Sequence, residues 1–183
     1  MNWNEVIRLA YKTAVEHGFW DGKPSYEHQA MLVITELSEA IDADRHGRHA
    51  DREKYKDMRA IIKESALGLN ERMGKRKKAF ELCIKDTVED ELADACIRLL
   101  DMMGHYGVGI ISDNEFTAGA DKSLCEFCFL VSEVLILGEK YVLNRALGMI
   151  LAYARHNNID LEWHINEKMA YNEQRPKLNG KKY

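Results

Sequence analysis

The sequence contains very little proline and no long apolar segment. Only Pro24 and Pro176 occur among 183 residues, so nothing between them forces a helix to break. No apolar run approaches the ~20 residues that a membrane-spanning helix needs. Runs of β-branched residues bounded by turn signals are scarce, whereas long segments with a helical apolar period are common. We therefore expect an all-α protein with no membrane association.

Charge and leader features argue against other classes. The formal net charge of −4 does not suit a protein whose main task is nucleic-acid binding, so no stable nucleic-acid complex is expected. Residues 1–12 lack the basic and then apolar layout of a signal peptide, which favours a cytoplasmic location. The length fits one domain, 1–183, with a sizeable core.

The cysteines and histidines do not form a recognisable metal set. In a cytoplasmic protein the four cysteines would be reduced. Cys125 and Cys128 form a CxxC pair without a second close pair, and their neighbours are apolar, so we interpret them as packing residues of a buried helix. None of the seven histidines has a glutamate three residues before it, which excludes the di-iron carboxylate type of bundle.

Two acidic motifs on amphipathic helices are the strongest chemical feature. Glu36 and Glu39 lie on one flank of a helix predicted over 25–46. Glu91 and Asp94 repeat this arrangement around an equivalent leucine in a second predicted helix. If the two helices pack antiparallel, all four carboxylates can face one gap.

Four carboxylates around one space predict a metal site. Oxygen ligands without histidine or cysteine select hard cations such as Mg²⁺, with Mn²⁺ as an alternative. Four acids exceed the needs of one ion, so two ions about 4 Å apart would fit. The plain alternative is that all four are ordinary surface acids, because a single ExxE on a helix is common.

The other segments predict a charged connection and a second apolar part. Residues 45–82 are highly charged and weakly periodic, so we expect one or two short helices in a mobile connection. Their basic run, 72–78, is either a solvated face or a lid that brings cations to a polyanionic substrate. After a loop over 108–120, residues 109–156 are expected to form an inserted helical pair. A last helix is predicted over 159–172, followed by a polar tail.

Side chains near the two acidic helices are further candidates for substrate binding. Trp20, beside Phe19, is either a hydrophobic plug against the next helix or an aromatic wall on which a base could stack. Lys85 precedes the second acidic helix, where it could meet a phosphate at the gap.

The acid motifs at 36–39 and 91–94 resemble the paired signature of the MazG-like, all-α nucleotide pyrophosphohydrolase superfamily. The HGFW sequence at 17–20 and the ending over 168–176 are similar to MazG-like members as well. The resemblance covers residues 1–47, 83–108 and 157–181. The chain departs from the family in the 51 residues between its acid pairs, a longer gap than usual, and in the inserted pair.

The resemblance implies Mg²⁺-dependent hydrolysis of a nucleoside triphosphate, canonical or modified, to a monophosphate and pyrophosphate, in nucleotide-pool cleaning. It also implies a homodimer or higher homo-oligomer. By carry-over, the four acids hold the metal and carry the catalysis. Lys168, Asn172 and Arg175 become candidates for phosphate or nucleotide contacts, and Arg175 suits this role because its planar fork can bind phosphate oxygens bidentately. Alternatively, these three only complement the helix dipole.

Two other functions remain compatible with these residues. One is a dimeric-dUTPase-like or phosphoribosyl-ATP pyrophosphohydrolase-like activity on the same scaffold. The other is a non-catalytic helical partner-binding protein, which predicts neither pyrophosphate release nor stabilisation by Mg²⁺.

Overall fold

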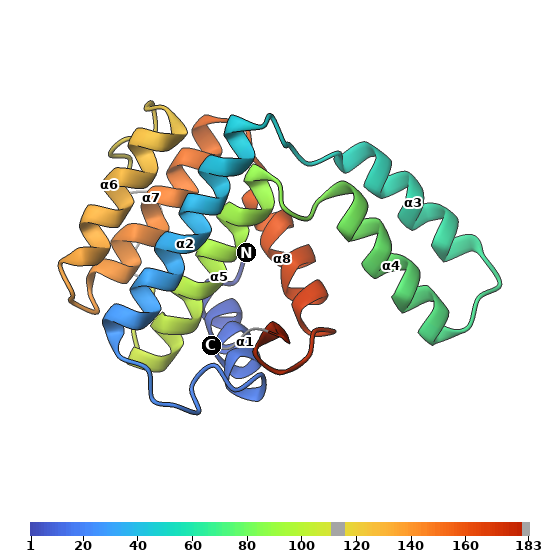
Figure 1. Cartoon of the computed structure of the whole chain (residues 1–183), viewed down its shortest axis with the longest axis horizontal. Coiled ribbons are helices and arrows are strands. Elements are labelled where there is room, and N and C mark those ends of the chain that lie inside the picture. Colours follow the sequence, from blue (N-terminus) through green and yellow to red (C-terminus); the bar gives the residue numbers. More distant parts are fainter. Residues whose placement is uncertain (111–115, 181–183) are drawn as a thin grey trace.

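The computed structural model describes residues 1–110 and 116–180 (Figure 1). In this part of the chain there are eight α-helices, one 3₁₀ helix and no strand, which confirms the all-α prediction. The bounds are α1 (Trp3–Glu16), α2 (Tyr26–Arg45), α3 (Arg52–Glu64), α4 (Leu69–Cys83), α5 (Val88–Tyr106), α6 (Leu124–Ile136), α7 (Val142–His156), α8 (Leu161–Asn172) and η1 (Lys177–Gly180). Residues 111–115 of the predicted loop and 181–183 of the polar tail lie outside the described residues. No described helix combines the length and apolar character required to cross a membrane.

Local capping signals set most helix ends. A side-chain oxygen before the first turn accepts a backbone N–H at six helices and thereby satisfies one otherwise orphaned donor. These caps are Asn2, Ser25, Asp51, Thr87, Ser123 and Asp160. Gly107 ends α5 with φ +66°, a left-handed conformation that favours glycine. The sequence predicted the two acidic helices to within a few residues.

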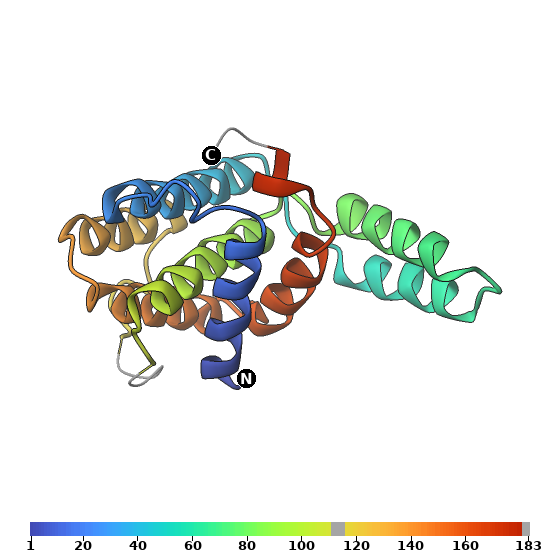
Figure 2. The same ribbon diagram turned by 90° about the horizontal axis from the view of Figure 1, so that it is seen from below.

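Helix α5 is the centre of the bundle. It contacts α1, α2, α7 and α8, and twelve of its 19 residues are buried. Helices α2 and α5 run antiparallel, and the N–H of Val88 donates to the Arg48 carbonyl oxygen where α2 ends and α5 begins (Figure 2). Helices α6 and α7 pack against α2 and α5, so the predicted inserted pair is present and belongs to the core of this chain.

Helix α8 closes the opposite side and brings the C-terminal segment to the end of α1. The N–H of Leu178 donates to the His17 carbonyl oxygen at 2.9 Å. Gly18 next to it has φ +80°, and its Cα faces the Lys177 side chain so closely that a Cβ would meet Lys177 Cε at 2.4 Å. The positive φ therefore favours glycine at this position, whereas the flexible end of the Lys177 side chain could shift to admit a Cβ.

The charged connection forms a helical hairpin, α3–α4, that projects from the bundle (Figures 1 and 2). The two helices pack on each other and bury a small cluster that includes Tyr55, Ile62 and Phe80. Tyr171 and Trp163 of α8 join this cluster. The prediction of one or two short helices is confirmed, and the hairpin is attached to the bundle through α8.

Candidate metal centre and adjoining pocket

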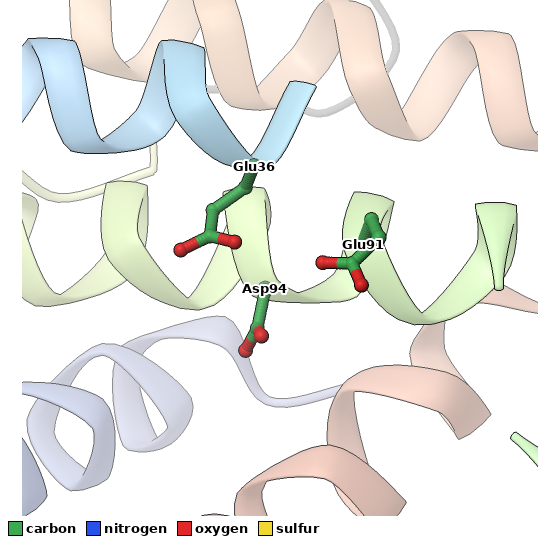
Figure 3. Close-up of side chains that lie close together, drawn as sticks. All are labelled: Glu36, Glu91 and Asp94. Carbon is green, nitrogen blue, oxygen red and sulfur yellow. The ribbon is translucent and has the colours of Figure 1, made fainter. Parts of the chain in front are cut away.

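Three of the four predicted acidic ligands converge between α2 and α5. Glu36 reaches from α2 toward α5, where Glu91 and Asp94 lie one turn apart (Figure 3). One carboxylate oxygen from each of the three lies within 4.8 Å of the others. Glu39 is exposed and lies outside this group, although its charge adds to the causes that raise the pKa of Glu36. The antiparallel packing of the acidic flanks therefore brings three side chains together and leaves the fourth at the surface.

The electrostatics of this cluster fit a cation. Burial raises the pKa of Glu91 to about 8, and burial followed by the charge of Asp94 raises the pKa of Glu36. Glu91 is 4% exposed, and among the described residues no hydrogen bond or ion pair reaches its carboxylate. Because neighbouring ionised carboxylates repel one another, a hard divalent cation bound by their oxygens would stabilise the cluster.

Lys168 forms ion pairs with two aspartates at the cluster. Its ammonium lies 2.6 Å from Asp90 Oδ2 and 2.8 Å from Asp94 Oδ2, and the side chain is buried. Burial raises the pKa of Asp90 to about 6, whereas for Asp94 the charge and hydrogen bond of Lys168 outweigh burial and lower the pKa. The sequence predicted a phosphate contact for Lys168, but the ammonium faces these two carboxylates and does not line the adjoining pocket.

Sequence reasoning missed two of these partners. The Oδ2 of Asp90 accepts from the Asp86 N–H and from Lys168, a role that the two acid motifs did not indicate. Arg98 was not considered, yet its Nε donates to Glu36 Oε1 at 2.5 Å. Both could have been found from spacing, because positions 90, 94 and 98 follow one another at four-residue steps along one face of α5.

An open pocket of about 670 Å³, its mouth included, adjoins the carboxylates. Residues of α1, α2, α5, α8 and the segments after α1 and α8 line it: Ala10, Thr13, Ala14, His17, Phe19, Glu36, Asp94, Ile97, Arg98, Asp101, Met169, Asn172 and Arg175. Two predicted substrate contacts, Asn172 and Arg175, thus share a pocket with Glu36 and Asp94. Asn172 Nδ2 also donates to Asp94 Oδ1 at 3.4 Å.

The remaining predicted contacts lie away from this pocket. Trp20 is 9% exposed and stacks on His105 of α5 at 3.7 Å between ring centroids, so it is a buried plug, but against α5 and not against the next helix as predicted. Phe19, its neighbour, supplies the aromatic wall instead. Lys85 pairs with the adjacent Asp86 and is not among the residues that line the pocket.

The interpretation of the CxxC cysteines as packing residues is confirmed for Cys128 and is wrong for Cys125. Cys128 is buried in the apolar core of α6, where burial raises its pKa, whereas Cys125 is exposed. Neither belongs to a metal-ligating group among the residues that the structure describes.

Comparison with known proteins adds no relative. No family model matches the chain, and neither a curated protein nor a solved structure is significantly similar to it.

Proposed function

We propose that this protein is a Mg²⁺-dependent nucleotide pyrophosphohydrolase of the MazG-like type. It would convert a nucleoside or deoxynucleoside triphosphate and water into a monophosphate and pyrophosphate. The observation that carries the proposal is the convergence of Glu36, Glu91 and Asp94 beside an open pocket, with Asn172 and Arg175 on its wall.

Each residue of the site has a role in this proposal. Glu36, Glu91 and Asp94 hold the ion, and Lys168 fixes Asp94 through the ion pair at 2.8 Å. When bound, Mg²⁺ or Mn²⁺ would neutralise phosphate charge and lower the pKa of an attacking water. A carboxylate oxygen of the cluster accepts the proton of that water. Glu39 joins as a fourth ligand if its exposed side chain turns inward along the flank that it shares with Glu36.

The pocket wall positions the substrate. Arg175 provides a planar guanidinium for phosphate oxygens, and Asn172 provides an amide next to Asp94. Phe19 gives the base an apolar face. The homodimer or higher homo-oligomer and the cytoplasmic location remain predictions.

Pyrophosphate release tests the proposal. The substrates are the eight common triphosphates, dUTP and phosphoribosyl-ATP, with Mg²⁺, and the proteins are wild type, Glu91→Gln and Glu39→Gln. We expect wild type to release pyrophosphate and Glu91→Gln to lose more than the ~10–100-fold that outer-shell changes cost. Glu39→Gln measures whether the exposed acid takes part. A dUTPase-like or phosphoribosyl-ATP-directed enzyme would respond to a single substrate of this panel.

A non-catalytic partner-binding protein is the second candidate. It is favoured by the ion pairs of Arg98 with Glu36 and of Lys168 with Asp94, which balance two of the three charges without a metal. This alternative predicts no pyrophosphate release and no rise in melting temperature with Mg²⁺. The proposed enzyme predicts both, and Glu91→Gln abolishes the rise.

A further inference from the structure

The pocket extends beyond the metal centre to another acidic side chain, Asp101. Asp101 follows Asp94 by seven residues on α5, which corresponds to about two turns and about 10 Å along the helix axis. It lines the same pocket although only 5% of its surface is exposed. Asp101 therefore lies on the pocket wall about two helical turns beyond Asp94.

The Asp101 carboxylate is held in one orientation. Trp20 Nε1 donates to Oδ1 at 2.6 Å, and the indole is itself held by its stack on His105. Among the described residues, no hydrogen-bond donor reaches Oδ2. One acceptor oxygen is thus occupied and fixed, and the other remains available at the pocket wall.

The surroundings of Asp101 suit a base better than a phosphate. Ala10 and Ala14 of α1, Ile97 of α5 and Phe19 give the pocket apolar walls, and Arg98 adds a charge that acts on Asp101. A carboxylate repels phosphate oxygens, whereas Arg175 and the cation centre would attract them. A nucleotide therefore fits with its phosphates at the metal centre and its base at Asp101.

We infer that Asp101 recognises the base and selects nucleotides whose base presents an exocyclic amino group, such as cytosine or adenine. The inference rests on the proposed function. A carboxylate oxygen accepts a hydrogen bond from an amino group, but it can only repel the carbonyl oxygen that uracil or hypoxanthine carries at the same position. A mismatch of this kind leaves two buried acceptors facing each other, and such arrangements discriminate strongly.

Monophosphate binding tests the inference without turnover. Calorimetric titration compares dCMP with dUMP, which differ at one ring position, with and without Mg²⁺ and at pH about 8.5. This pH keeps the side chain ionised, because burial raises the pKa of Asp101 to about 7. We expect wild type to bind dCMP at least about 10-fold more tightly than dUMP. The kcat/KM values for dCTP and dUTP provide a second readout.

Asp101→Asn should reverse this preference. The asparagine oxygen can still accept from Trp20, while its amide places an N–H donor where Oδ2 was, so dUMP should bind more tightly than dCMP. Trp20→Phe is the matched control, because it retains the ring on His105 but removes the donor. It should reduce the discrimination without reversing it, and it also tests the inference if the asparagine variant fails to fold.

The outcomes separate this inference from the proposed function. Equal binding of dCMP and dUMP, or binding of neither, overturns the recognition role of Asp101, as does an unchanged preference in Asp101→Asn. Pyrophosphate release without base discrimination leaves the enzyme and removes the recognition role. A reversed preference without pyrophosphate release keeps the recognition role and removes the enzyme.

Discussion

The bundle and the α3–α4 hairpin consist of similar helices but bury very different amounts of side chain. In the bundle, α5 is covered on several sides, and twelve of its residues are buried, Asp90, Glu91 and Asp101 among them. In the hairpin, only Tyr55 and Ile62 are buried on α3 and three residues on α4. The candidate site lies in the region that can exclude water, where paired charges interact strongly.

The hairpin depends on a few contacts with α8. Phe80 stacks on Tyr171 with 4.6 Å between ring centroids, and the Tyr55 hydroxyl donates to Glu167 at 2.6 Å. A thin cluster of this kind can open separately while the bundle stays folded. Helix α8 therefore contacts both regions. Its Lys168 pairs with the acidic centre, and its Tyr171 packs against the hairpin.

The largest effect is expected from Lys168→Met, which removes the cation between Asp90 and Asp94 and leaves one buried and one partly buried carboxylate. Loss of one partner from a buried pair costs roughly 3–5 kcal/mol. Urea denaturation measures this loss in the free energy of unfolding. Lys177→Met breaks the exposed pair with Asp21 and should cost less than about 1 kcal/mol. Equal losses in the two variants would contradict the distinction between buried and exposed charge.

Phe80→Ala should open the hairpin without unfolding the bundle. Removal of a buried phenylalanine ring costs about 3–5 kcal/mol, and the loss should fall on the α3–α4 unit. Hydrogen exchange should therefore accelerate by about 100-fold or more in α3 and α4 while α2 and α5 keep their rates. Leu99→Ala in α5 is the comparison and should accelerate exchange throughout. Uniform acceleration in both variants would show that the two regions unfold as one.

Acid should weaken the α8 junction through His164. Burial lowers the pKa of His164 to about 4 from 6.5, although Glu89, Asp160 and Glu167 act in the opposite direction and Arg52 adds to the lowering. The unfolded chain therefore binds more protons between pH 6.5 and 4, so this stabilisation is complete above pH 6.5 and falls as the pH drops toward 4. The loss amounts to about 3 kcal/mol.

Denaturation of wild type and His164→Gln at several pH values isolates this contribution. The difference in unfolding free energy between the two proteins should shrink or change sign as the pH falls from 6.5 to 4. A constant difference would assign the acid response to other groups.

The smallest effect is expected at the exposed part of the hairpin. Lys75 and Lys78 are exposed, and Lys75 pairs only with Glu71 one turn away. Replacement of both by alanine should change the free energy of unfolding by less than about 0.5 kcal/mol. If these lysines form a solvated face, KM for the triphosphate stays unchanged as well. A several-fold rise in KM would identify the hairpin as a lid for the substrate.

Local sequence signals predicted the helices because caps and apolar periods act within one segment. The apolar stripes of α2 and α5 placed Glu36 and Asp94 toward one gap. Glu39 lies about 60° further round its helix than Glu36, and this small rotation takes it to the surface.

The contacts of the site that the sequence did not predict depend on packing between helices that are far apart in the chain. A lysine near the end of a helix is usually exposed, so the burial of Lys168 follows only from the placement of α8 against α5. The pairs of Arg98 with Glu36 and of Trp20 with Asp101 likewise join segments far apart in the chain. Such contacts leave no local periodic signal.

The closure of α8 and the segment after it onto the end of α1 also sets the order of events during synthesis. Residues 1–160 emerge from the ribosome first, and in them Asp90 and Asp94 lack the ammonium of Lys168. The nascent acidic pair must stay hydrated until α8 arrives, because its burial alone is unfavourable. Docking of α8 therefore completes the bundle, and Asp94 acquires its final orientation only at that step.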